Sequence, residues 1–244
     1  MDVYQKKLTE EEAKAWVHQY YEGVKAKKNS RFNAIINLVQ GEKKKILDYG
    51  CGWGHLSNHL STKGHNVTGI DLNKSEIEIC QSVWGIKENL TFLNKQINYF
   101  DPESFDLIIS SQVIEHVHNV GNYLSEINRV LSPLGELIIT LPNLLTPKFI
   151  LLNGRMNIES ILKRINKNIL ENFDKRDLHI NAWDPLHFTH LVSTLGFEVI
   201  EFLPAEGLSF PFNKYINLPF FKNFSYTMCF RLKKVKRVKL KSFD

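Results

Sequence analysis

The chain has 244 residues, a formal net charge of +5 at pH 7 and 43% hydrophobic residues, which suits a single α/β domain with some elaboration. The basic excess is local, because residues 231–241 hold seven of the 31 basic residues and no acidic one. The rest of the chain, with 24 basic against 26 acidic residues, is slightly acidic. A protein that grips nucleic acid spreads Lys and Arg over one face, so the composition argues against that class.

Three cysteines, Cys51, Cys80 and Cys229, show neither metal-ligand spacing nor an even disulfide framework. We therefore expect a reducing compartment, the cytoplasm, and no bound metal. The charged residues 1–14 lack the apolar core of a signal peptide. The longest apolar stretch, 134–152, is interrupted by charged residues and prolines, so we expect no transmembrane segment.

Two helices are expected at the start of the chain, over about 10–27 and 30–39, because apolar residues recur there on one face. The remaining pattern predicts four parts of the chain. These are N-terminal helices over 1–40, a main domain over 41–234, an insertion over 144–185 within it, and a basic tail over 235–244.

The stretch ILDYGCGWG, Ile46 to Gly54, predicts a strand that ends at Leu47, a tight glycine turn and then a helix over HLSNHLSTKG. This is the opening of a nucleotide-binding βαβ unit, and the glycines let the backbone turn sharply and touch a ligand. A dinucleotide fingerprint requires a third glycine where this chain has His55. Asp48 before the turn would repel a pyrophosphate, but it stabilises an ammonium or sulfonium group. S-adenosylmethionine, which carries both cations, a carboxylate and no phosphate, therefore suits the turn better than NAD.

A second carboxylate, Asp71, ends the second predicted strand, HNVTGIDLN over 65–73, and a helix is predicted after it, from Lys74 to about Val83. An acidic side chain at that place accepts hydrogen bonds from both hydroxyls of a ribose. The fourth predicted strand, Phe105–Ser111, is a nearly continuous apolar run, as expected for a parallel strand buried on both faces. Ligands lie at the carboxyl ends of such strands, so we expect Ser111 and Gln112 beside the cofactor.

The fifth predicted strand is ELIITLPN, over 136–143. Together with FDLIISSQVIEHV (105–117) and LSPLGELIITLPN (131–143), these motifs resemble the class I S-adenosylmethionine-dependent methyltransferases. The closest group is the broad bacterial small-molecule and glycan methyltransferase family that includes the ubiquinone-biosynthesis O-methyltransferases. The resemblance covers roughly 44–202. It implies a Rossmann-like, doubly wound α/β sheet that is mostly parallel, with helices on both faces and an antiparallel last strand, here over 225–234. It also implies that the N-terminal helices close the cofactor site; packing on the sheet edge is the alternative.

The resemblance further implies an adenine contact after the third strand, 90–94, where relatives often carry an acid. Here Gln96 stands at that place, so we expect Gln96 to bond the adenine and Ile97 to pack on the ring. The expected contacts with S-adenosylmethionine, and with its product S-adenosylhomocysteine, are Asp48, Gly50, Cys51, Gly52, Gly54, Asp71, Leu72, Gln96, Ile97, Ser111 and Gln112.

Within the insertion, apolar residues over 158–170 recur at helical spacing and predict an amphipathic helix. In the resembled family such insertions roof the substrate pocket; simple cover for the sheet is the alternative. An aromatic, proline-rich segment over 204–223 is open to three interpretations, a pocket wall, a dimer contact or a membrane contact. The basic tail is either a solvated end or a peripheral contact with an anionic membrane surface.

A hydroxyl acceptor of a methyl group benefits from a general base, and histidine titrates in the right range. His116, after the fourth strand, and His179, in the insertion, are the two candidate bases. The residues SSQV at 110–113 stand where enzymes that methylate bases in nucleic acids carry an Asn/Asp-Pro-Pro-aromatic turn, which argues against that substrate class. We expect O-methylation of a small polar acceptor such as a sugar, a nucleotide-linked intermediate or a surface-glycan precursor, by a monomer or homodimer. N-methylation of a small amine and a non-catalytic, cofactor-binding partner protein are the alternatives.

Overall fold

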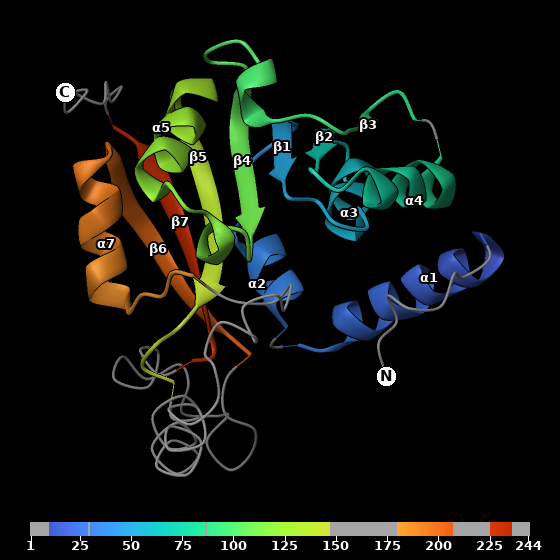
Figure 1. Cartoon of the computed structure of the whole chain (residues 1–244), viewed down its shortest axis with the longest axis horizontal. Helices are drawn as coiled ribbons and strands as arrows, with labels where there is room; N and C mark the ends of the chain where they lie inside the picture. The colour runs from blue at the N-terminus through green and yellow to red at the C-terminus, as the bar shows by residue number, and fades with distance from the viewer. Residues whose placement is uncertain (1–9, 29, 86, 147–179, 207–224, 236–244) are drawn as a thin grey trace, which may run out of the picture.

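The computed structural model describes residues 10–28, 30–85, 87–146, 180–206 and 225–235 (Figure 1). Seven strands within these residues form one sheet in the order β3-β2-β1-β4-β5-β7-β6. Their bounds are β1 Lys45–Tyr49, β2 Asn66–Ile70, β3 Leu90–Leu93, β4 Phe105–Ser111, β5 Leu131–Pro142, β6 Phe197–Ala205 and β7 Thr227–Lys234. Strands β1 to β5 pair in parallel, and β7 runs antiparallel to both of its neighbours. The predicted fold class, mostly parallel with an antiparallel last strand, is confirmed.

Helices cover both faces of the sheet, as in a doubly wound fold. The helices α1 Glu10–Ala26, α2 Arg31–Leu38, α3 His55–Thr62 and α4 Lys74–Trp84 share one apolar cluster with the sheet. The helices α5 Val120–Val130 and α7 Pro185–Thr194 belong to the cluster on the other face. In Figure 1, α1 and α2 lie at the lower end of the sheet, toward which the arrow of β4 points. The carboxyl ends of the parallel strands therefore face these two helices.

The helix starts follow local capping chemistry that the sequence carries. Ser30 accepts a hydrogen bond from the Asn33 amide at the start of α2, and Asn73 accepts one from the Ser75 amide at the start of α4. Asp184 caps α7 through the amides of residues 186 and 187. Each cap satisfies amides that have no partner in the first turn of a helix, which fixes where the helix begins.

Two strands differ from the sequence expectation. Strand β1 continues through Asp48 to Tyr49 instead of ending at Leu47, so Asp48 pairs with β2 and β4 and lies 2% exposed inside the sheet. Strand β5 begins at Leu131 rather than at Glu136, because Leu131 pairs with Phe105 across an irregularity in the ladder. The first difference is important for the site, because it places a carboxylate in the core.

Several predicted features lie outside the described residues. They are the amphipathic stretch 158–170, His179, all but the first three residues of the aromatic segment 204–223, and nearly all of the basic tail. Among the helices that the structure describes, none combines the length and the apolar character that crossing a membrane requires.

Candidate functional site

The glycine turn after β1 is held by the strand beside it. The amides of Gly50 and Cys51 both donate to the carbonyl of Ile70, the last residue of β2, at 2.9 and 3.0 Å. A Cβ on Gly50 would lie 2.4 Å from Cγ2 of Val113, so only glycine lets the turn after β4 approach this closely. The turn that follows β1 and the turn that follows β4 are therefore packed together at one edge of the sheet.

Asp71 links this turn to β2. Its Oδ2 accepts a hydrogen bond from the Gly52 amide at 3.1 Å, and its Oδ1 accepts one from the Asn73 amide at 2.8 Å. Each carboxylate oxygen has a second lone pair, so Asp71 can still accept from two ribose hydroxyls. Glu76 lies nearby, and burial together with the charge of Asp71 raises its pKa.

A shallow hollow of about 420 Å³ lies beyond Asp71. Its lining consists of Leu72, Asn94, Lys95, Gln96, Asn98 and Tyr99. Two large apolar side chains are exposed there, Leu72 at 68% and Tyr99 at 59%. The structure thus brings Leu72 and Gln96 together, whereas Ile97 turns its side chain into the core and is 5% exposed. Leu72 and Tyr99 offer apolar surface for an adenine ring, with polar side chains around it.

A second cavity, of about 130 Å³, lies between the ends of β1 and β4 and the helices α1 and α2. Its lining consists of Tyr20, Val24, Ser30, Arg31, Phe32, Ile35, Asp48, Cys51, His55, Leu56, Ser111 and Glu206. Three predicted contacts, Asp48, Cys51 and Ser111, are therefore in one cavity. Arg31, His55 and Glu206 line it as well, and the sequence reasoning gave these three residues no role.

Asp48 is the buried acid of the cavity. It accepts a hydrogen bond from Ser57 Oγ at 2.5 Å, yet burial raises its pKa from 3.8 to about 6. The charge of Asp71 raises it further, while the bond from Ser57 opposes the rise. An ammonium or sulfonium group in the cavity would favour the ionised form, because a buried carboxylate is stabilised by a nearby cation.

Arg31 and His55 add groups that can donate hydrogen bonds to the cavity that holds the Asp48 carboxylate. Arg31, the first residue of α2, lies 3.9 Å from the carboxylate of Glu206 and is partly exposed. Burial, together with the charge of Arg31, lowers the pKa of His55 to about 4, so the imidazole is neutral. Its Nδ1 is buried and has no hydrogen-bond partner among the described residues. A guanidinium and an unsatisfied imidazole suit a carboxylate ligand, since its oxygens can accept from both.

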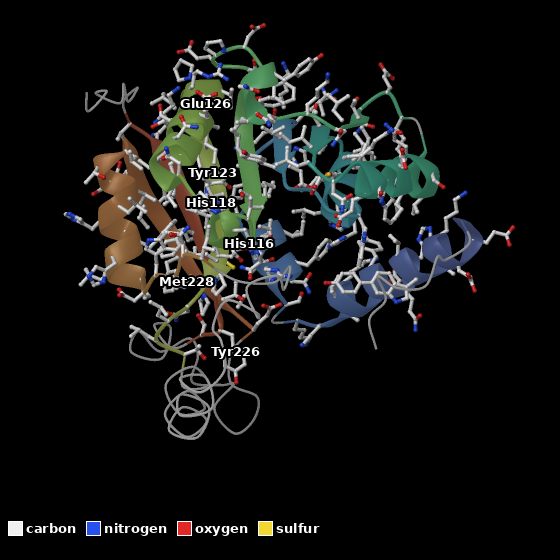
Figure 2. All side chains as sticks on the ribbon, viewed as in Figure 1. His116, His118, Tyr123, Glu126, Tyr226 and Met228 are labelled. Atoms are coloured by element: carbon white, nitrogen blue, oxygen red, sulfur yellow. The ribbon has the colours of Figure 1, made fainter. Side chains whose placement is uncertain are left out.

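The turn after β4 is fastened to β5. The Gln112 amide donates to the carbonyl of Thr140 at 3.0 Å, and Ser111 Oγ lies 3.0 Å from Thr140 Oγ1. Gln112 has a φ of +58°, an uncommon conformation for a residue other than glycine, at the end of the sheet where ligands bind. Figure 2 shows His116 near the tip of β4. His116 is exposed, and its role as a base stays a prediction.

The donor set fits S-adenosylmethionine from end to end. The hollow with Leu72 and Tyr99 suits adenine, Asp71 suits the ribose, and the cavity holds a carboxylate for the cations and a guanidinium for the carboxylate of the methionine end. No cluster of three or more metal-binding side chains occurs in the described part of the chain.

Comparisons with known proteins agree with this geometry. The family model described as Methyltransferase domain matches residues 17–202. A ubiquinone biosynthesis O-methyltransferase of Rickettsia conorii is 35% identical over 143 residues, which cover 57% of this chain and 47% of the relative. The chain thus spans about half the length of this curated relative.

Solved structures show the same fold. A methyltransferase of Haloferax volcanii, in complex with the activator Trm112, gives a TM-score of 0.61 at 16% identity and covers 92% of this chain and 98% of its own. The 1,6-didemethyltoxoflavin-N1-methyltransferase of Burkholderia thailandensis, with bound S-adenosylhomocysteine, gives a TM-score of 0.57 at 18% identity. This match covers 92% of this chain and 87% of that protein. The family model spans most of the chain, and the chain belongs to the methyltransferase domain family, as a class I methyltransferase domain whose cofactor is S-adenosylmethionine.

Proposed function

We propose that this chain transfers the methyl group of S-adenosylmethionine to a hydroxyl of a small polar acceptor. The observation that carries the proposal is the cavity in which Asp48, Arg31 and Ser111 meet at the carboxyl ends of β1 and β4. The hydroxyl, rather than another acceptor atom, is favoured by the O-methyltransferase name of the relative that is 35% identical. A sugar, a nucleotide-linked intermediate or a surface-glycan precursor are the acceptors that we propose.

The chain's residues would hold the cofactor in an extended form across the end of the sheet. Asp71 would accept from the ribose hydroxyls, Arg31 would bind the carboxylate of the methionine end, and Asp48 would face its ammonium. When bound, S-adenosylmethionine supplies an already activated methyl group. The protein's task is then to align the acceptor and to exclude water.

A hydroxyl acceptor must also lose its proton, and the sequence pointed to His116 and His179 for this step. Replacing each histidine by glutamine should lower turnover more than cofactor affinity if that histidine is the base. Unchanged turnover in both variants would remove both from this role.

Two alternatives keep the same cofactor site. One is N-methylation of a small amine, which fits the name of the structurally similar N1-methyltransferase and needs less help from a base. The other is a non-catalytic cofactor-binding protein that serves a partner. The basic tail leaves peripheral contact with an anionic membrane as a further proposal.

The deciding experiment measures the release of S-adenosylhomocysteine from S-adenosylmethionine with two groups of acceptors. The hydroxyl probes are catechol, methyl glucoside and UDP-glucose; the amine probes are phenethylamine and glucosamine. Asp71→Ala is the inactive control. Product with hydroxyl probes supports the proposal and product with amines alone supports N-methylation. Tight S-adenosylhomocysteine binding with no product from any probe favours the partner protein.

A further inference from the structure

A buried acid that the cofactor does not account for lies in the turn after β4. Glu115 is the middle residue of a short 3-10 helix, Ile114–His116, that follows the carboxyl end of β4. Its side chain is 1% exposed, and both carboxylate oxygens lack a hydrogen-bond partner among the described residues. Buried polar groups in folded proteins are nearly always paired, so an unpaired one at the ligand end of a sheet requires an explanation.

The backbone at Glu115 is held firmly. Its carbonyl accepts hydrogen bonds from the amides of Ile180 and Asn181 at 2.9 and 3.1 Å, and Asn181 Nδ2 donates to the carbonyl of Val117 at 2.5 Å. Residues 180 and 181 come from a part of the chain more than sixty residues away. The turn is thus clamped from two sides, by this segment and by Val113 against Gly50.

Glu115 follows Ser111, a residue of the cavity lining, by four positions, and the charge of Arg31, which also lines the cavity, acts on it. Burial raises its pKa from 4.5 to about 7, against the charge of the Arg31 guanidinium, which lowers it. Arg31 lines the cavity with Ser111 and Glu206, and Glu206 is its ionic partner there. Burial raises the pKa of the Tyr123 hydroxyl on α5, and the charge of Glu115 makes a small further contribution in the same direction. A carboxyl group that titrates near neutrality is suited to both accepting and releasing a proton.

We propose that Glu115, rather than a histidine, accepts the proton of the acceptor hydroxyl during methyl transfer. This inference rests on the proposed O-methylation. The acceptor oxygen forms its bond to the methyl carbon, the electron pair of the broken sulfur–methyl bond stays on sulfur, and the hydroxyl proton moves to a carboxylate oxygen of Glu115. The carboxyl then loses this proton to water after the products leave. His116, on the exposed side of the same turn, has no part in this transfer.

The test uses the full chain with Glu115→Gln, Glu115→Asp and the matched charge control Glu198→Gln, an exposed acid of β6. On the best hydroxyl probe of the panel above, Glu115→Gln should lower kcat at least about 100-fold, as expected for loss of a general base. Affinity for S-adenosylhomocysteine should stay within about threefold, and Glu198→Gln should match the wild type. The wild-type kcat should rise with pH through about 7, and this dependence should vanish in Glu115→Gln. Glu115→Asp should restore part of the activity together with the pH dependence, which a role in packing alone would not do.

A second measurement does not depend on the acceptor. In protein labelled with [5-¹³C]glutamate, one carboxyl resonance should titrate near pH 7 and be missing from Glu115→Gln. The inference is overturned if no such resonance belongs to Glu115, or if Glu115→Gln keeps kcat within about threefold. A wild type that binds S-adenosylhomocysteine and methylates only amines would overturn the hydroxyl acceptor itself, and this inference with it. A wild type without cofactor affinity would instead refute the proposed function at its first step.

Discussion

The amide of Gly52 donates a hydrogen bond to Asp71 Oδ2 at 3.1 Å, and this bond joins the turn after β1 to the carboxylate after β2. The other oxygen of Asp71 holds the amide of Asn73 at the start of α4. One side chain therefore shapes the glycine turn and the start of a helix, and each of its oxygens keeps a second lone pair that can accept from a ligand. Asp71 is thus expected to contribute both to folding and to ligand binding.

Replacing Asp71 by alanine should separate these two contributions. We expect the affinity for S-adenosylhomocysteine to fall at least tenfold, because hydrogen bonds to a charged acceptor contribute roughly 1.5–3 kcal/mol. The free energy of unfolding should fall by about 1–3 kcal/mol, because two amides lose their acceptor. Calorimetric titration and urea unfolding measure the two effects. Asp101→Ala, at an exposed position before β4, is the matched control and should change neither. Wild-type affinity in Asp71→Ala would contradict the assignment of the ribose contact.

Arg31 allows a test that depends on which part of the ligand is present. Arg31→Gln should weaken binding of S-adenosylhomocysteine by roughly 10-fold or more, because a charge-assisted pair with the carboxylate is lost. Binding of 5′-methylthioadenosine, which has the adenine and ribose but no amino-acid end, should stay unchanged. An equal loss with both ligands would show that Arg31 acts on the shape of the site and does not bind the carboxylate.

Asp48 should make the protein less stable at neutral pH. Its pKa is raised from 3.8 to about 6 in the folded state, so between these values the folded chain binds more protons than the unfolded one. The contribution of Asp48 to the free energy of unfolding therefore falls as the pH rises from about 4 to about 6, by about 3 kcal/mol in total. Above that range it is constant.

Asp48→Asn removes this titration and keeps an oxygen that can accept from Ser57. We expect the variant to unfold at a higher temperature than the wild type at pH 8, and the difference to shrink as the pH is lowered to 4. Its affinity for S-adenosylhomocysteine should fall, because the counter-charge for the ammonium is gone. Thermal unfolding at several pH values measures the first effect. A variant less stable than the wild type at pH 8 would show that the ionised carboxylate is stabilised by a partner, against the raised pKa.

Much of this fold could be predicted because its signals are local. Strand β4 is a continuous apolar run and was predicted at its observed bounds, Phe105–Ser111. The caps Ser30 and Asn73 place helix starts within a residue of the prediction, because capping depends on neighbours only two or three residues away. The position of Asp71 directly after β2 follows from the alternation of strand and turn.

The rest of the site depends on contacts between distant segments. Arg31 and Glu206 are 175 positions apart and meet only because α2 packs beside β6 and β7. That Glu115 has no hydrogen-bond partner within the described ranges becomes visible only once its burial is known. Ile97 was expected at the adenine, but the short 3-10 helix Ile97–Tyr99 turns its side chain into the core. The same helix leaves Tyr99 exposed at the hollow. Side-chain direction inside a short irregular turn has no periodic signal in the sequence.

The glycines of the first βαβ unit provide a matched pair for the last prediction. Gly54 has a φ of +71°, and a Cβ there would lie 2.6 Å from two ring atoms of Phe92 and 2.9 Å from the sulfur of Cys80. Gly64 has a φ of +94°, but a Cβ there would meet nothing within 4 Å. Both changes to alanine impose backbone strain of roughly 1–2 kcal/mol, and only Gly54→Ala adds a clash with a buried ring. Urea unfolding should therefore show Gly64→Ala destabilised by about 1–2 kcal/mol and Gly54→Ala by about 3 kcal/mol or more. Cofactor affinity should fall in Gly54→Ala alone, since Gly64 lies at the far end of α3. An equal loss of unfolding free energy in both variants would show that the close packing of Phe92 against the turn contributes nothing.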